Sequence, residues 1–224
     1  MTISLVARDA ATGAFGMVIS SSSPAVASRC LHLRARVGAV ASQNVTNPAL
    51  GPGLLDALEG GAGPADALAA VLADEPYPAY RQVTVVDAAG DVGVHSGANA
   101  LGVFGSAVGD AAVAAGNLLA GPEVVQAMLD GYASSDAGMF EGRLLDGLRG
   151  ALAAGGEAGP LRSAGLAVVE DVPWPVTDLR VDDADDPVGE LARLLDLWLP
   201  QKAAYRTRAL DPREAPSYGV PGDL

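Results

Sequence analysis

Hydroxyl side chains gather near the start of the chain, at a spacing that suits nucleophilic or hydrogen-bonding chemistry. Thr2 begins an alternating apolar pattern that predicts a strand, and the serine run Ser20–Ser23 ends the next apolar run. The turn-forming stretch Asp9–Gly13 lies between the two runs, so together they predict a β-hairpin. If the protein is an enzyme, we expect its site at the open end of this hairpin, where the chain start and the serines converge.

Amide side chains follow two further predicted strands. Gln43 and Asn44 come at the end of the apolar run 37–43, and Asn117 follows a small-residue strand predicted over residues 111–115. Amides at strand ends suit an oxyanion hole or a clamp for a substrate carboxylate. Asn44 is also a good turn residue, and Asn117 is equally able to cap the following turn, so both roles stay open.

His95 and Cys30 are further candidates for acid–base or nucleophilic chemistry. His95 lies on the return strand of a second predicted hairpin, where it is either a general acid or base or a structural histidine. Cys30 lies two residues before His32, a spacing at which helical side chains do not face each other. A lone cysteine between Leu31 and Leu33 is more often a small buried hydrophobe than a nucleophile.

Metal and cofactor sites have little support in the sequence. The chain has two histidines and one cysteine, which makes a His- or Cys-rich metal site unexpected. An acidic run precedes the last predicted helix, and it either binds a divalent cation or supplies favourable charge at a helix N-terminus. We favour the second interpretation and expect no metal and no cofactor. The acidic residues are Asp182, Asp183, Asp185 and Asp186.

The predicted elements come in groups: hairpin, strand, two helices, hairpin, strand, two helices, two strands and a helix. Strands that cluster in hairpins and helices that come in pairs indicate an α+β fold, not βαβ alternation. Several strands are apolar on both faces, which two stacked antiparallel sheets with helices outside would explain. We expect one domain over residues 1–199 and an extended C-terminal arm over residues 200–224.

The charge and composition of the chain limit the classes of partner that we expect. The net charge of −13 and the pI of about 4.3 argue against nucleic acid or an anionic membrane as a partner. No signal-peptide pattern and no apolar run of membrane-spanning length is visible, so we expect a soluble cytoplasmic protein.

Five segments resemble the family known as domain of unknown function 1028, in order and over nearly the whole chain. They are TISLVARDAATGAFGMVISSSSPAV, VGAVASQNVTNPALGPGLLDAL, YRQVTVVDAAGDVGVHSGA, AAGNLLAGPEVVQAM and DLRVDDADDPVGELARLLDL. This family is similar to the N-terminal-nucleophile (Ntn) hydrolases. The resemblance implies their fold, a four-layer αββα sandwich of two antiparallel sheets.

The same resemblance implies a role for Thr2. In Ntn hydrolases the first residue of the mature chain attacks an amide carbonyl, and its own α-amino group acts as the base. Removal of Met1 would free Thr2 for this role; the alternative is an ordinary strand residue. We take Thr2, His95 and Asn117 as catalytic candidates. The substrate-binding candidates are Ser21, Ser23, Gln43 and Asn44.

Two departures stand out, the first from the Ntn pattern and the second from the pattern of the domain of unknown function 1028 family. These enzymes often place a lysine near the nucleophile, but no lysine precedes Lys202, and arginine does not relay protons. Where a basic, Gln-containing segment is expected before the last core strand, this chain has Glu157 and Arg162.

Two functions therefore remain. One is an amidohydrolase that acts on a small amide or peptide bond with an N-terminal nucleophile; its partner is a small-molecule or peptide substrate. The other is a non-catalytic small-ligand-binding protein on an Ntn-like scaffold.

The C-terminal segment predicts an assembly. It contains apolar and aromatic residues such as Tyr205, Tyr218 and Val220 together with several basic residues. It is therefore the most basic part of an otherwise acidic chain. Such a segment is attracted to an acidic surface. We expect the arm to lie across a second subunit in a twofold-symmetric homodimer.

Overall fold

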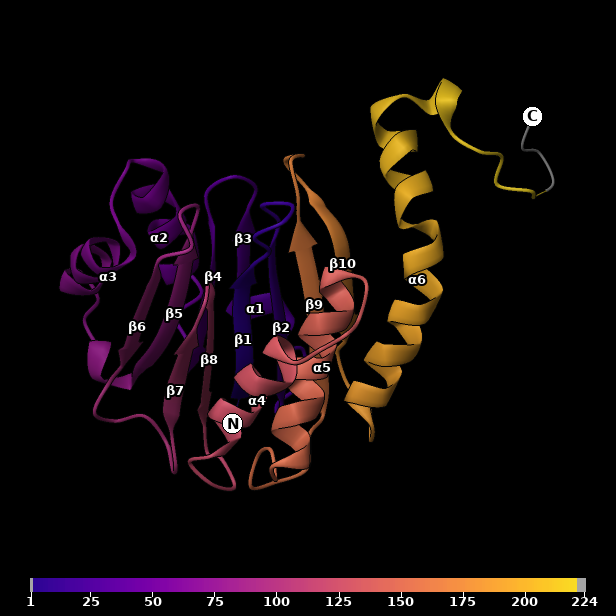
Figure 1. Ribbon diagram of the computed structural model, residues 1–224. Helices are drawn as coiled ribbons and strands as arrows, with labels where there is room; N and C mark the ends of the chain where they lie inside the picture. Colours follow the sequence, from indigo (N-terminus) through magenta and orange to yellow (C-terminus); the bar gives the residue numbers. More distant parts are fainter. Residues whose placement is uncertain (1, 221–224) are drawn as a thin grey trace.

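The computed structural model describes residues 2–220, and ten strands in this range form two antiparallel sheets (Figure 1). The hairpin at the chain start occupies the centre of the larger sheet, because β1 pairs with β2 on one side and with β8 on the other. In spatial order the larger sheet contains β10 (Pro175–Val181), β9 (Ser163–Val169), β2 (Phe15–Ser21), β1 (Thr2–Arg8), β8 (Ala112–Asn117) and β7 (Gly105–Gly109).

The smaller sheet has four strands in the order β3-β4-β5-β6. Its two central strands are the apolar strand that precedes the Asn- and Pro-rich loop and the first strand of the second predicted hairpin, whose return strand lies at the edge. The strands are β3 (Leu31–Arg34), β4 (Gly38–Asn44), β5 (Arg81–Asp87) and β6 (Val92–Ser96).

Helices cover one face of each sheet. Apolar side chains of the larger sheet, Ile3 and Leu5 among them, pack against α4, α5 and α6, whereas Val83 and Val85 of the smaller sheet pack against α2 and α3. The short α1 joins β2 to β3. The helices are α1 (Ala27–Cys30), α2 (Leu50–Glu59), α3 (Pro64–Ala73), α4 (Val124–Ala133), α5 (Phe140–Ala153) and α6 (Pro187–Leu210).

The remaining faces of the two sheets contact each other. Val6 and Phe15 of the larger sheet belong to one buried cluster with Ala39 and Val86 of the smaller sheet. Since successive side chains of a strand point to opposite faces, Thr2 shares the inter-sheet face of Val6. The centre of this layer is apolar, and its end near Thr2 is polar.

Strand β3 and the full length of β10 differ from what the sequence predicts. The sequence around Cys30 predicts a short helix or an irregular segment, whereas the structure has both α1 and β3 there. The sequence predicts only a short strand at residues 179–181, whereas β10 begins at Pro175. Both strands depend on pairing with β4 and β9 respectively, which local sequence does not reveal.

The expectation of an extended arm from Pro200 onward is wrong over its first part, because α6 continues through Pro200 to Leu210. Contacts after the proline explain the continuation. Lys202 lies 2.7 Å from carboxylate oxygens of both Glu141 and Glu170, and the ring of Tyr205 stacks on that of Trp198. A short 3-10 turn at Pro212–Glu214 follows, and residues 221–224 of the predicted arm lie outside the described range.

None of the helices within residues 2–220 combines the length and apolar character that crossing a membrane requires.

Candidate functional site

A polar cluster fills the end of the inter-sheet layer where β1 begins. Thr2 pairs with Asn117 across β1 and β8, and Ser21 ends the neighbouring strand β2. From the smaller sheet, Gln43 and Gln82 face the same space as a cross-strand pair of β4 and β5. The strand ends thus bring together four of the residues predicted from the sequence, Thr2, Ser21, Gln43 and Asn117, and add Gln82.

Hydroxyl groups form a row that leads away from Thr2. The Oγ1 atom of Thr2 lies 3.5 Å from Oγ of Ser21, which in turn lies 2.8 Å from Oγ of Ser23. Arg29 donates a hydrogen bond from Nη2 to Ser23 Oγ, so a positive charge ends the row. When Ser23 donates to Ser21, the hydroxyl of Ser21 is able to donate to Thr2 and to stabilise negative charge on its oxygen.

Gln82 organises the amide groups. Its Nε2 atom donates to Gly116 O at 3.0 Å, which orients the side chain, and its Oε1 atom accepts from Gln43 Nε2 at 2.9 Å and from Asn117 Nδ2 at 3.1 Å. The side-chain oxygens Oε1 of Gln43 and Oδ1 of Asn117 are buried and have no hydrogen-bond partner within the described residues. Unpaired buried acceptors are uncommon and suit a ligand that carries N–H groups.

Glu157 also reaches this end of the sheets. Its Oε2 atom accepts a hydrogen bond from the backbone N–H of Ser22 at 3.1 Å, and the residue is 7% exposed. Burial raises the pKa of its carboxyl group to about 7. Gly155 and Gly156, with φ of +107° and +60°, allow the turn after α5 that returns the chain to this position.

Asn44 and His95, two candidates from the sequence, lie outside this polar cluster. Asn44, at φ +69°, donates to Tyr80 O and accepts from the N–H of Leu101, which makes it an anchor between loops. His95 pairs across β5 and β6 with Val83, whose side chain packs on the helix-covered face, and the structure therefore does not bring His95 together with Thr2. The imidazole Nε2 donates to the carbonyl oxygen of Pro78 at 2.8 Å.

Cys30 is buried within the inter-sheet cluster, and burial raises the pKa of its thiol to about 11. A thiol with this pKa is almost entirely protonated near neutral pH and is a poor nucleophile.

The acidic run before α6 serves structural roles. Asp186 accepts a hydrogen bond from the N–H of Gly189 and caps the helix. Asp183 and Asp185 form ion pairs with Arg162, which places that arginine on the surface.

Sequence reasoning did not select Gln82, and it noted Glu157 only as a departure from the family pattern. The available signal for Gln82 was a large polar residue directly before the valine-rich run 83–86 of a predicted strand, and for Glu157 it was the Gly-Gly pair that precedes it.

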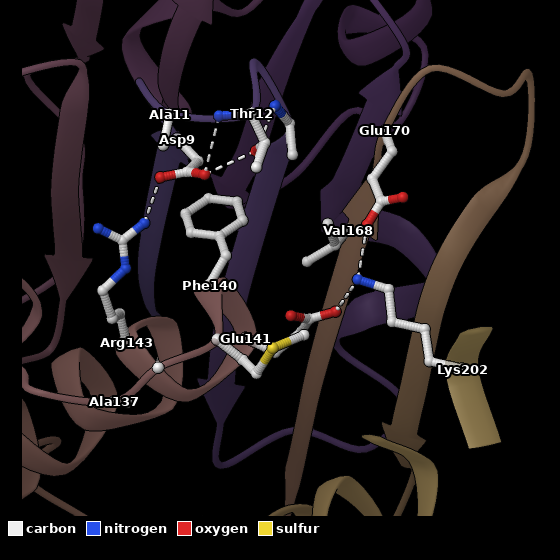
Figure 2. A pocket seen from close by; sticks show the side chains of 13 residues that line it. Asp9, Ala11, Thr12, Ala137, Phe140, Glu141, Arg143, Val168, Glu170 and Lys202 are labelled. Carbon is white, nitrogen blue, oxygen red and sulfur yellow. Dashed lines mark hydrogen bonds and ion pairs between the residues drawn. The ribbon is translucent and has the colours of Figure 1, made fainter. Parts of the chain in front are cut away.

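A hollow with a volume of about 360 Å³ lies at the opposite end of the larger sheet (Figure 2). Its charged side chains form ion pairs with one another: Arg143 lies 2.5 Å from Asp9, and Lys202 lies between Glu141 and Glu170. Among the described residues, Oε2 of Glu141 has no hydrogen-bond partner. Asp9 follows the far end of β1, so this hollow is distant along the strand from Thr2. We therefore take the Thr2 end of the sheets as the candidate site.

Two antiparallel sheets with helices on one face of each, and hydroxyl and amide groups gathered at the head of a central strand, define an α+β protein with a buried polar site. Its sequence places it in a family: the chain belongs to the family of unknown function DUF1028, which matches residues 2–191. The predicted resemblance to the family known as domain of unknown function 1028 is confirmed. Helix α6 extends beyond the matched region.

A solved structure supports the same assignment. The crystal structure of protein SPO2555 from Silicibacter pomeroyi, also of the DUF1028 family, is 32% identical and superimposes with a TM-score of 0.81 over 88% of each chain. None of the curated proteins is similar to this chain.

Proposed function

We propose that the protein is an Ntn-type amidohydrolase in which Thr2 is the nucleophile and the substrate is a small amide or peptide. The observation that carries the proposal is the position of Thr2: it begins a central strand, faces the inter-sheet layer and has its hydroxyl 3.5 Å from that of Ser21, beside Asn117. The helices outside the two sheets support the four-layer αββα arrangement of Ntn hydrolases.

The proposed reaction uses the residues of the polar cluster. With Met1 removed, the α-amino group of Thr2 takes the proton from Oγ1, and this oxygen attacks the amide carbonyl carbon. The proton then passes to the leaving amine as the C–N bond breaks, and water hydrolyses the ester on Thr2. The predicted loss of Met1 concerns a residue outside the described range.

Amide groups would bind the substrate in this scheme. The NH₂ group of Asn117 has two hydrogens, and Gln82 accepts one of them. Within residues 2–220 no other acceptor bonds to this group, so the second hydrogen would be available to an oxyanion. The carbonyl oxygens of Gln43 and Asn117 would accept hydrogen bonds from N–H groups of the substrate.

A non-catalytic small-ligand-binding protein is the second candidate. It is favoured by the burial of Thr2, which is 5% exposed, and by the position of Lys202, the sole lysine of the sequence, beside Glu141 and Glu170. This candidate retains Met1 and turns over no amide. For both candidates we propose that the protein acts in the cytoplasm.

Intact mass of the native protein and a screen of amide and dipeptide substrates test the proposal. We expect a mass without Met1, no turnover by Thr2→Ala and partial turnover by Thr2→Ser. Thr207→Ala, an exposed site on α6, is the matched control and should keep full activity. Retained Met1, or turnover by Thr2→Ala equal to that of the wild type, would contradict the proposal.

A further inference from the structure

The loop after α5 crosses the head of strand β1. In the larger sheet β1 lies between β2 and β8. Glu157 contacts the segments that follow both neighbours: its carboxylate accepts the N–H of Ser22, just after β2, and its backbone forms a bridge with Leu119, just after β8. The adjacent hydrogen bond from the N–H of Ala158 to Leu118 O strengthens the second contact. Glu157 therefore spans the position from which Thr2 enters the sheet.

The carboxylate has an unused acceptor in this place. Glu157 is 7% exposed, and its Oε1 atom is buried without a hydrogen-bond partner among the described residues. Leaving a buried carboxylate oxygen unpaired is costly, so the position suits a donor that bears positive charge. The head of β1 is where the α-amino group of a chain beginning at Thr2 must lie.

Other cations on the surrounding segments are engaged elsewhere. On the β2 side, Arg29 donates to Ser23 Oγ and to the carbonyl oxygens of Pro24 and Ala25. On the segment that leads into β9, Arg162 pairs with Asp183 and Asp185. The residues that Glu157 and the adjacent Ala158 contact are Ser22, Leu118 and Leu119, and none of the three has an ionisable side chain.

We propose that Glu157 is a positioning residue that binds the α-ammonium group of Thr2 and stabilises the positive charge that this group acquires when it takes the proton from Oγ1. This inference deepens the proposed function and rests on it. Glu157 remains a carboxylate throughout, while the proton moves from Oγ1 to the amine and then to the leaving group. Its neutral form, favoured by burial, would bind the ammonium group less well.

The test uses the full chain produced with Thr2 as its first residue, by cleavage of an N-terminal tag. The pH dependence of acetylation by acetic anhydride, followed by mass spectrometry, reports the titration of the α-amino group. The protein then has two amines, the α-amino group and Lys202, so the lysine serves as an internal control. In Glu157→Gln the loss of the carboxylate should lower the pKa of the α-amino group by about one unit, which is a tenfold change in its protonation equilibrium.

Turnover provides the second measurement. Glu157→Gln should lower kcat at least tenfold and move the acidic limb of the pH–rate profile to lower pH, while Glu157→Asp restores part of both. A purely structural role would lower the melting temperature and leave both midpoints unchanged, and that result would overturn the inference.

A third measurement needs no variant. The ¹³C signal of the Glu157 carboxyl carbon should titrate at lower pH in protein that begins with a free Thr2 amine than in the same protein after N-terminal acetylation. Equal midpoints would overturn the inference even if Glu157→Gln fails to fold. If no amide is turned over but the amine and carboxyl titrations are coupled, the proposed function fails and the contact between Glu157 and the α-amino group stands.

Discussion

At the scale of single residues, Gln82 has the most demanding position, because its one amide group satisfies partners from both sheets. It donates to Gly116 O of the larger sheet and accepts from Gln43 and Asn117, all in a layer from which water is excluded. The orientation of both candidate substrate-binding amides therefore depends on a residue that would not itself contact the reacting atoms.

Replacing Gln82 with leucine should destabilise the protein by about 2–4 kcal/mol, because buried donors on Gln43 and Asn117 lose their acceptor without gaining another. Urea unfolding measures the change. Gln126→Leu is the matched control, since Gln126 is exposed and bonds only to Asp130 on its own helix, and its effect should stay within about 0.5 kcal/mol. A loss below about 1 kcal/mol in Gln82→Leu would show that the amide network does not join the sheets.

The residues of the site were partly predictable. Thr2, Ser21, Gln43 and Asn117 follow from the rule that polar residues at strand ends gather at one edge of a sheet. Packing between distant segments decides which face of β6 contacts the other sheet and which contacts the helices. Because the sequence does not reveal this packing, His95 was selected as a candidate although it lies on the face that helices cover.

At the scale of elements, the part of helix α6 that follows its proline is held to the rest of the protein by ion pairs, whereas the part before it packs through apolar side chains. The side chain of Lys202 is 11% exposed, that of Glu141 is 1% exposed, and Thr177 links this carboxylate to Trp198 (Figure 2 shows the two carboxylates at Lys202). Glu141 lies at the start of α5 and Glu170 follows β9, so a single lysine joins three parts of the chain.

Lys202→Met should cost about 3–5 kcal/mol, because it leaves the buried carboxylate of Glu141 without its cation. Hydrogen exchange of the amides in residues 200–210 should accelerate more than that of the sheets. Arg193→Met removes only an exposed pair with Glu190 on the same helix and should change stability by less than about 1 kcal/mol. If Glu141→Gln restores stability to Lys202→Met, the unpaired carboxylate is the cause. Equal losses of stability in Lys202→Met and Arg193→Met would contradict the prediction.

Local signals were sufficient to predict the hairpins β1–β2 and β5–β6, since turn residues act over a few positions, but not the pairing of β7 with β8. The continuation of α6 was missed because it depends on Glu141, which lies 61 residues before Lys202. Strand β3 was missed for the same reason, as its regularity comes from pairing with β4.

At the scale of the whole molecule, the C-terminal part of α6 and the segment after it form one edge of the protein, where Arg206 pairs with Asp171 just after β9 (Figure 1). Tyr205, Leu210, Tyr218 and Val220 are exposed there, at 41%, 55%, 54% and 57%. Arg208 lies over the rings of both tyrosines, which orders the segment without covering it. These features agree with the homodimer predicted from the sequence, which stays a prediction.

Deleting residues 205–224 should convert a dimer into a monomer, because it removes these exposed apolar side chains together with most of the local positive charge. Light scattering at micromolar concentration gives the mass of both forms. A monomeric full-length protein would contradict the prediction of a dimer. A truncated protein that stays dimeric would show that the subunits are joined by another surface.

The central position of β1 also has a consequence for biosynthesis. Its partner β8 begins at Ala112, so on the order of 100 further residues must be synthesised before the first strand acquires its second neighbour. At about 5–20 residues per second this takes roughly 5–20 s. During this interval β1 has at most its hairpin partner β2, so its first residues are more accessible than in the finished fold, where Thr2 is 5% exposed. The removal of Met1 that we propose would therefore be easier during synthesis than after folding.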